Sequence, residues 1–156
     1  HPFSIGPNKQ LQRDAHGRIH FLSSDDLSHS QNEAVISPKY SWSQQTQGST
    51  RIEYRLAARC PKTFSGEIFD ADVIGSMITF RHWREGDRFQ PIGRTSASKL
   101  KTLFINAKIS NSDKRSAALG VTMVGDIFWV EGLRIGELAK VRQNTQRFLL
   151  WKWSKI

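Results

Sequence analysis

The sequence predicts an α+β domain built mostly from antiparallel β-sheet in a sandwich-like arrangement, with one principal helix near residues 98–108. Three observations predict it. Apolar and polar residues alternate over Ser49–Ala57, which is typical of a half-buried strand. A Gly125-Asp126 pair separates two apolar runs, which indicates a β-hairpin. Apolar residues at helical spacing in Leu100–Ala107 indicate the helix. Strand signals outnumber helix signals along the whole chain, which favours the α+β class.

Length and composition indicate a folded protein with its own core. The chain has 156 residues, 38% of them hydrophobic, with five Trp and nine Phe. The single cysteine, Cys60, cannot form an internal disulfide, which fits a reducing compartment. The sequence contains neither an apolar run of about 20 residues, as a membrane helix requires, nor a signal peptide. We therefore expect a cytoplasmic location and no membrane contact.

The first 33 residues are predicted to form a lead-in β-hairpin and linker, followed by one domain over residues 34–156. Leu11–Arg13 and Arg18–Leu22 flank the turn-rich sequence DAHG. The polar stretch Ser23–Glu33 then indicates a linker or an exposed loop.

The next segments are predicted to be two strands separated by a loop. Ala34–Ile36 is followed by Pro38, which ends a strand or confines it to a sheet edge. Gln44–Thr50 has the composition of a loop. The strand Ser49–Ala57 places three apolar side chains on one face: Ile52, Tyr54 and Leu56.

The centre of the chain is predicted to contain a strand and then the principal helix. Glu67–Gly75 leads into the strand Met77–Trp83. Ser96 or Ser98 is expected to cap the helix N-terminus. The buried face of the helix is predicted to comprise Leu100, Leu103, Phe104 and Ala107.

The last third is predicted to be mainly strands. Ser112–Leu119 is a candidate for a short second helix. Val121–Val124 and Ile127–Val130 form the predicted hairpin, which Leu133–Ile135 is expected to continue. Thr145–Trp153 reads as a strand that is apolar on both faces.

Positive charge is concentrated in the second half of the chain. The whole sequence has 23 basic and 14 acidic side chains, for a net charge of +9. Residues 1–70 contain 8 basic and 7 acidic side chains, whereas residues 71–156 contain 15 and 7. An excess of this kind attracts phosphate backbones or anionic lipid, although basic residues also serve solubility alone.

The densest positive region is FRHWREGDRFQPIGRTSASKLKTLFINAK, residues 80–108, with four arginines and three lysines. Asp87 is expected to fix a loop by pairing with Arg84 and Arg88. Three further residues are expected to shape the backbone: Gly86, Pro91 and Gly93. The clustering favours a binding surface over isolated solvated charges.

The start of the predicted helix is a candidate phosphate site. Free amides at a helix N-terminus, preceded by Arg94 and accompanied by Lys99 and Lys101, favour anions. Trp83 and Phe89 are of the type that stacks on bases, but a core position is the favoured interpretation for Phe89.

Signals for catalysis within this chain are weak, and we predict no catalytic residue and no metal site. Asp70 and Asp72 would share a face on a strand and suit a divalent cation, yet Asp is also common at ordinary turns. Cys60 and the five His lack zinc spacing. We find neither a phosphate-loop motif nor a nucleophile elbow. His82 is expected to be paired or exposed.

Five sequence blocks, taken together, resemble the C-terminal domain of tRNA(Ile)-lysidine synthetase over roughly Ile68–Leu150. They are Phe69-Asp-Ala-Asp, Arg81-x-x-x-Glu-Gly-Asp-Arg-Phe-Gln-Pro-Ile-Gly, Lys99-Leu-Lys-x-Leu-Phe-Ile-x-x-Lys-Ile, Ile127-Phe-Trp-Val-x-Gly-Leu-Arg-Ile and Thr145. The departures from the family pattern are one lysine in place of a pair at Ser98-Lys99, Ala97 or Ser96 for a glycine, and Ser110 and Ala118 for prolines.

The resemblance implies a parent enzyme that attaches lysine to the wobble cytidine of tRNA(Ile), using ATP with Mg. In that family the reaction belongs to an N-terminal domain with an SGGxDS loop, and no such loop occurs in this sequence. The chain is therefore expected to need no cofactor, to be inactive alone, and to grip the acceptor stem of tRNA(Ile) for the upstream catalytic domain. The RNA-binding residues predicted on this basis are Arg81, Arg84, Arg88, Arg94, Lys99, Lys101, Lys108 and Arg134.

Two other functions remain open from the residues alone. The same basic side chains suit a stand-alone module that binds another structured RNA. The apolar segment Phe148–Trp153 suits a dimerisation domain, in which case the protein would form a homodimer.

Overall fold

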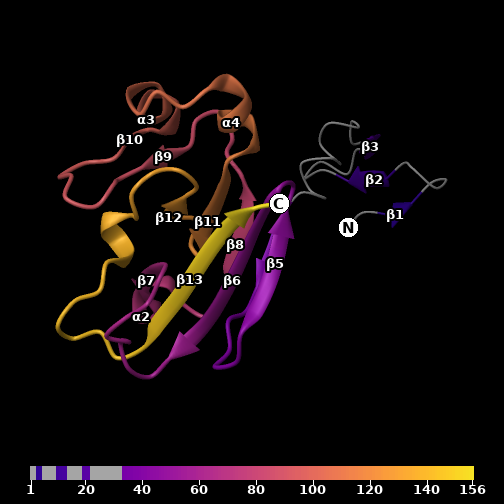
Figure 1. Ribbon diagram of the computed structural model, residues 1–156. Coiled ribbons are helices and arrows are strands. Elements are labelled where there is room, and N and C mark those ends of the chain that lie inside the picture. Colours follow the sequence, from indigo (N-terminus) through magenta and orange to yellow (C-terminus); the bar gives the residue numbers. More distant parts are fainter. Residues whose placement is uncertain (1–2, 5–9, 14–18, 22–32) are drawn as a thin grey trace. The chain divides into compact units, whose positions relative to one another are not determined.

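The computed structural model describes residues 3–4, 10–13, 19–21 and 33–156 (Figure 1). The chain divides into two units, His1–Asn32 and Glu33–Ile156. In the first unit, the sheet order is β1-β2-β3, with antiparallel pairing. Its strands are β1 (Phe3–Ser4), β2 (Gln10–Arg13) and β3 (Ile19–Phe21). The two strands of the predicted hairpin are confirmed. The predicted linker up to residue 32 lies outside the described residues.

The second unit contains two four-stranded antiparallel sheets, which confirms the predicted β-rich α+β class. The first sheet has the order β12-β11-β8-β4. Its strands are β4 (Ala34–Ile36), β8 (Ile78–His82), β11 (Ala118–Thr122) and β12 (Ile127–Val130). The second sheet has the order β5-β6-β13-β7. Its strands are β5 (Ser43–Gln47), β6 (Thr50–Ala57), β7 (Glu67–Asp70) and β13 (Phe148–Lys155).

The main core lies between the two sheets and is rich in aromatic rings. Trp151 of the second sheet lies 5.3 Å from Trp129 and 5.5 Å from Phe128 of the first sheet, centroid to centroid. All three side chains are fully buried, so each removes a large apolar area from water. Gly120 on β11 makes room for this packing, because a Cβ there would lie 2.7 Å from Cζ of Phe128. The arrangement confirms the sandwich.

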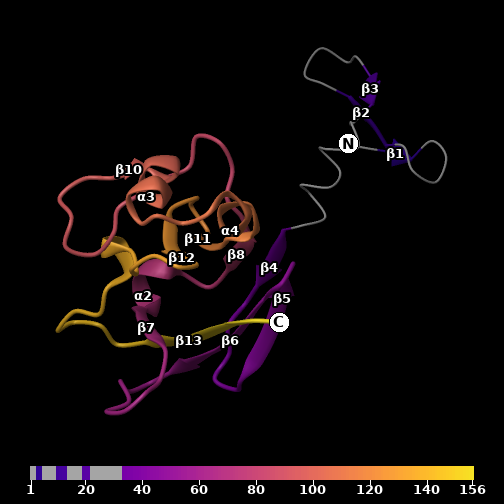
Figure 2. The same ribbon diagram turned by 45° about the horizontal axis from the view of Figure 1, so that its top comes forward.

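A second cluster joins the principal helix to the other face of the first sheet. Helix α3 (Leu100–Asn106) buries Leu100, Leu103 and Phe104, as its spacing predicts, but the prediction is wrong for Ala107, which is the exposed C-cap. They pack with Leu119 of β11 and with Phe89, which is 1% exposed and so confirmed as a core residue. Figure 2 shows α3 on the side of β11 and β12 that faces away from β13.

Two predictions near α3 and β5 are wrong. Neither Ser96 nor Ser98 caps the helix; the N-cap is Lys99, without a side-chain hydrogen bond. The backbone of Ser98 pairs instead with Phe89, in a two-stranded ribbon of β9 (Arg88–Phe89) and β10 (Ser98–Lys99). The predicted loop at residues 44–50 is mostly strand β5, because backbone pairing with β6 stabilises even a polar edge strand.

The boundaries of the last strands also differ from the predictions. The second helix, α4 (Asn111–Ser116), ends before residue 119, and β11 begins at Ala118. The hairpin to β12 is confirmed, but its turn runs over residues 123–126 rather than two residues, closed by a 2.7 Å bond from Thr122 N to Asp126 O. Residues 133–135 do not form a strand; they lead into the 3-10 helix η1 (Glu137–Ala139).

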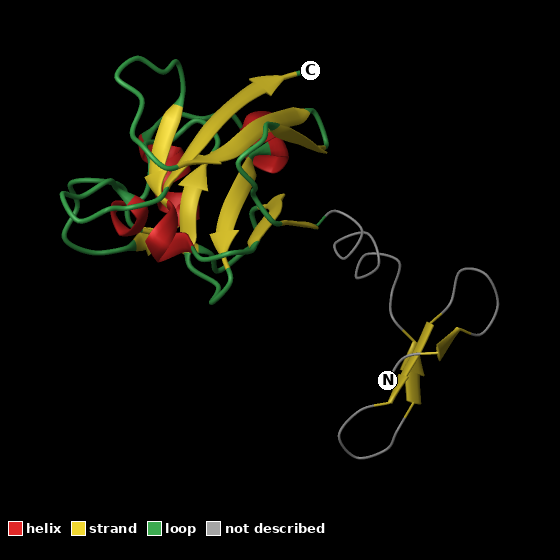
Figure 3. Cartoon of the chain, turned by 90° about the horizontal axis from the view of Figure 1, so that it is seen from below, coloured by secondary structure: helices red, strands yellow, loops and turns green. Residues whose placement is uncertain are grey.

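The C-terminal strand β13 lies in the middle of its sheet, between β6 and β7 (Figure 3). Its residues Phe148–Trp151 are buried, which explains why the sequence is apolar on both faces. Leu149 and Trp151 face the main core, whereas Phe148 and Leu150 pack with Ala57 on the opposite face. The expected dimer interface at residues 148–153 is thus mostly occupied by contacts within the chain itself.

Candidate nucleic-acid interface

The turn that opens the positive stretch is held by one carboxylate. Asp87 accepts two hydrogen bonds of 3.0 Å from the guanidinium of Arg81 and one of 2.6 Å from the backbone N–H of Arg84. Both side chains of the pair are largely buried, at 12% and 13% exposure. The predicted pairing of Asp87 with the Arg84 and Arg88 side chains is wrong, because Arg81 approaches from β8 with a bidentate geometry.

Two of the eight predicted RNA-binding side chains are neutralised. The charge of Arg81 is compensated by Asp87. The guanidinium of Arg84 forms an ion pair with Glu33 on the segment that precedes β4. Neither side chain offers an uncompensated charge to a phosphate.

Three cations lie together on the ribbon and the first turn of α3, and we call them the cationic ledge: Arg88, Lys99 and Lys101. Arg88 and Lys99 are cross-strand partners, and all three are exposed. Like charges opposite each other on a ribbon destabilise it, so this arrangement favours an anionic ligand. Arg88 is held by a 3.1 Å bond from Nη2 to the carbonyl of Ala97. The helix itself contributes less than predicted, because the N–H of Leu100 donates to Asp87 O.

The remaining two predicted arginines line one pocket of about 270 Å³, which we call the arginine pocket. Arg94 comes from the loop after β9 and Arg134 from the loop after β12, 40 residues later in the chain. The rest of the lining is apolar apart from one amide, and is contributed by Pro91, Ile92, Leu103, Asn106, Ala107 and Leu133. The structure therefore brings together two cations that are distant in sequence.

Hydrogen bonds hold the walls of the arginine pocket. Ile92 N donates to Ile135 O at 2.8 Å, and Gln90 Nε2 donates to Arg94 O at 2.6 Å. Pro91 and Gly93 form a turn closed by Arg94 N, with φ of 85° at Gly93, a value that favours glycine. Gly86 has φ of 93° in the neighbouring turn.

Glu137 anchors this wall and was not singled out from the sequence. Its Oε1 accepts a 2.9 Å hydrogen bond from the N–H of Gly93. The side chain of Lys140 and the Gly93 amide lower the pKa of Glu137, so the carboxylate stays ionised and keeps its hydrogen bond. The two residues are 44 positions apart, and no local pattern connects them.

Lys108 stands at the end of α3 with a left-handed backbone, φ 57°. It is the only non-glycine residue with positive φ within residues 33–156. The N–H of the next residue, Ile109, donates to Phe104 O at 3.0 Å, a helix-ending bond that fits a left-handed residue at Lys108. Glycine is the usual residue at this position, so the lysine makes the fold less stable than a glycine would.

We expect the substitution Lys108→Gly to raise the free energy of unfolding by about 1 kcal/mol, because it removes the left-handed strain of a side chain with a Cβ. Urea unfolding followed by Trp fluorescence measures this. The matched control is Lys108→Ala, which removes the same charge but keeps the Cβ, and should leave stability within about 0.5 kcal/mol of the parent. Equal stability of the two variants would contradict the interpretation.

The carboxylates of Asp70 and Asp72 both accept hydrogen bonds from backbone N–H groups. Asp70 caps the short helix α2 (Ala71–Ile74) by accepting a 2.9 Å bond from Asp72 N, so the two residues do not share a strand face. Asp72 accepts from Gln146 N at 2.8 Å and from Arg147 Nε at 3.0 Å. The Gln146 amide, followed by the Arg147 side chain, lowers the pKa of Asp72. The hypothesis of a divalent-cation site on a strand is therefore wrong.

No group of three or more His, Cys, Asp or Glu suited to a metal ion occurs in the described part of the chain. None of the helices in that part is long and apolar enough to cross a membrane.

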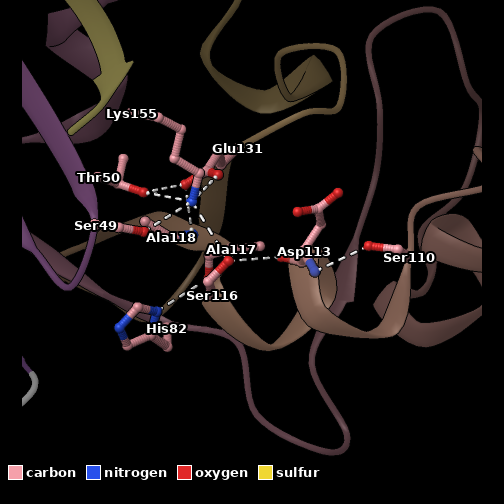
Figure 4. Close-up of polar contacts among 10 residues, drawn as sticks. All are labelled: Ser49, Thr50, His82, Ser110, Asp113, Ser116, Ala117, Ala118, Glu131 and Lys155. Atoms are coloured by element: carbon pink, nitrogen blue, oxygen red, sulfur yellow. Dashed lines mark hydrogen bonds and ion pairs between the residues drawn. The ribbon is translucent and has the colours of Figure 1, made fainter.

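A buried polar cluster links the two sheets and has no local sequence signal (Figure 4). Glu131, only 7% exposed, accepts hydrogen bonds from the Thr50 hydroxyl, the Ala118 amide and Lys155 Nζ, the last at 2.8 Å. The half-buried His82 lies beside it, with Nδ1 3.4 Å from Ala117 O. The charges of Glu131 and Lys155 are therefore paired with each other and are not available to a ligand.

Comparison with known proteins gives consistent results for this unit. A sequence profile of the TilS substrate C-terminal domain matches residues 78–151. The tRNA(Ile)-lysidine synthase of Clostridium acetobutylicum is 41% identical over 81 residues, which are 52% of this chain and 17% of that protein. The bifunctional protein TilS/HprT of Listeria monocytogenes is 24% identical over 128 residues, which are 82% of this chain and 20% of that protein.

The fold is also shared with a solved structure. The crystal structure of a TilS C-terminal domain matches with a TM-score of 0.65 and 21% identity, over 80% of this chain and 98% of that chain. The chain spans about a fifth or less of the length of the curated relatives named above. Residues 78–151, which include the cationic ledge and the arginine pocket, therefore match the TilS substrate C-terminal domain, and the chain is homologous to the C-terminal region of tRNA(Ile)-lysidine synthases.

Proposed function

We propose that this chain grips the acceptor stem of tRNA(Ile) without itself catalysing a reaction. The observation that carries the proposal is a group of five exposed cations on adjoining elements, none of which forms an ion pair within residues 33–156: Arg88, Arg94, Lys99, Lys101 and Arg134. They belong to the β9–β10 ribbon with its loop, the first turn of α3 and the loop after β12, which pack around one apolar cluster.

The chemistry of these side chains suits a double-stranded RNA stem. An A-form stem presents phosphates and 2′-hydroxyl groups across a shallow minor groove and is recognised mostly by shape and charge. Arginine binds phosphate oxygens with two parallel N–H groups, and lysine acts as a point charge. The ribbon and helix α3 position Arg88, Lys99 and Lys101 on one folded support, which lowers the entropic cost of binding.

We propose further that the catalytic partner is an upstream domain of the same polypeptide, a synthase that joins lysine to the wobble cytidine of tRNA(Ile) using ATP with Mg, in the cytoplasm. The support is the homology together with the absence of an SGGxDS loop from this sequence. Binding a remote part of the tRNA would raise the effective concentration of the anticodon at the catalytic domain.

The proposal predicts a steep dependence of RNA affinity on salt. With five phosphate contacts, the logarithm of the association constant should fall against the logarithm of salt concentration with a slope of about −4. Fluorescence anisotropy with a labelled tRNA(Ile) transcript measures this slope. The double substitution Lys99→Ala with Lys101→Ala should make the slope about 2 less steep.

Two exposed lysines outside the ledge provide the matched control. Lys39→Ala with Lys62→Ala removes the same charge from the protein and should leave the slope close to that of the parent. A flat salt response, or equal effects of the two double variants, would contradict the proposed surface. Equal affinity for tRNA(Ile) and for an unrelated structured RNA would favour a general RNA-binding module.

A further inference from the structure

The arginine pocket has a composition that differs from the rest of the cationic surface. A contact with the phosphate backbone of an RNA stem requires only exposed cations, as on the cationic ledge. Here Arg94 and Arg134 line a pocket together with apolar side chains that include Leu103, which is 6% exposed, and Leu133, which is half-buried. A partly apolar pocket that is also lined by two arginines suits a ligand that is both flat and anionic.

A single nucleotide has these properties. Its base presents two apolar faces, which are covered by neighbouring bases in a duplex and free only in an unpaired nucleotide. The side-chain amide of Asn106 lines the same pocket and offers both donors and an acceptor to a base edge. A guanidinium can stack on the base or bind the attached phosphate.

The pocket is also formed in advance of binding. Two hydrogen bonds connect the 90–94 segment to the 135–137 segment: Ile92 N donates to Ile135 O, and Gly93 N donates to Glu137 Oε1. A third, from Gln90 Nε2 to Arg94 O, holds the 90–94 segment itself. Neither Arg94 nor Arg134 forms an ion pair within residues 33–156, so both charges are available to a ligand. Its volume of about 270 Å³ is of the order that one nucleotide requires.

We propose that the arginine pocket binds one unpaired nucleotide of the RNA, with the base against Leu103 and Leu133 and the phosphate between Arg94 and Arg134. This inference rests on the proposed function, since it assumes that the chain binds RNA. The proposed surface would then contact one base that lies outside the stem, in addition to recognising the shape and charge of the stem.

The test compares three RNA hairpins that share one stem: a hairpin with a blunt end, one with a single-nucleotide 3′ overhang and one with a single-nucleotide bulge. Affinities are measured with the 156-residue chain at one salt concentration. We expect the overhang or the bulge to bind about tenfold more tightly than the blunt hairpin. An abasic residue at the same position should abolish most of that preference.

Two variants, one at the C-cap of α3 and one within α3, show where the unpaired nucleotide binds. Ala107→Leu adds a side chain within the pocket and should reduce the preference to about one, while affinity for the blunt hairpin is unchanged. Thr102→Leu adds a comparable side chain at an exposed α3 position outside the pocket lining, and should retain the preference. Lys99→Ala with Lys101→Ala should weaken all three complexes and keep their ratio.

Equal affinity for all three hairpins, with the steep salt dependence intact, would overturn this inference and leave the proposed function standing. A preference that survives Ala107→Leu would also overturn it, because the unpaired base would then bind elsewhere. Failure to bind any of the hairpins or tRNA(Ile) would overturn the inference and the proposed function together.

Discussion

Replacing Asp87 by alanine should lower the free energy of unfolding by about 3 kcal/mol, because it leaves the largely buried guanidinium of Arg81 without its partner. The substitution also removes the acceptor of the Arg84 N–H in the turn before the ribbon. The β9–β10 ribbon follows this turn directly, so we expect weaker RNA binding even where the protein remains folded. Urea unfolding and anisotropy with labelled tRNA measure the two effects.

Glu85 provides the matched control for Asp87. It is an acidic, exposed residue in the same turn, and Glu85→Ala should change stability by less than about 0.5 kcal/mol. The double variant Arg81→Met with Asp87→Leu should be less destabilised than Asp87→Ala alone, since no buried charge remains. If Asp87→Ala were as stable as Glu85→Ala, the pair with Arg81 would not stabilise the turn.

Replacing Glu131 by alanine should also cost about 3 kcal/mol. The carboxylate is the acceptor for the buried Thr50 hydroxyl and the Ala118 amide, and the ion-pair partner of Lys155. Its removal leaves the Thr50 hydroxyl and the Ala118 amide without this acceptor and breaks the contacts that join the two sheets.

A graded series distinguishes the contributions at Glu131. Glu131→Gln keeps an acceptor but not the charge, and should cost less than the alanine substitution. Glu53→Ala, at an exposed acidic residue of β6, should cost less than about 0.5 kcal/mol. Equal denaturation midpoints for Glu131→Ala and Glu53→Ala would show that the buried cluster does not stabilise the fold.

Local patterns predicted those elements whose burial repeats along the chain. The alternation around Ile52 and Tyr54 and the helical spacing of Leu100 and Phe104 each correspond to one buried face. Strand β5 was missed because its stability comes from backbone pairing with β6, which leaves no apolar signal. The cap at Ser98 was wrong because pairing with Phe89 determines where that backbone lies.

The candidate site was predictable as a charged region but not as an arrangement. The density of arginine and lysine after residue 80 indicated a binding surface. Which carboxylate pairs with which cation depends on the tertiary fold, so the partners of Asp87 and the loss of Arg81 and Arg84 to ion pairs could not be read from spacing. The meeting of Arg94 with Arg134 likewise depends on how two loops pack against α3.

The position of β13 has a consequence for synthesis on the ribosome. Of the described strands it is translated last, yet it separates β6 from β7 in the sheet. A nascent chain that has emerged only as far as β12 can form the β5–β6 hairpin, but β7 still lacks its neighbour and Trp151 is missing from the core. Pairing between segments so far apart along the chain is slow to form. We therefore expect this unit to complete its folding only after its final strand has been translated, with β6 and β7 exposed to chaperones until then.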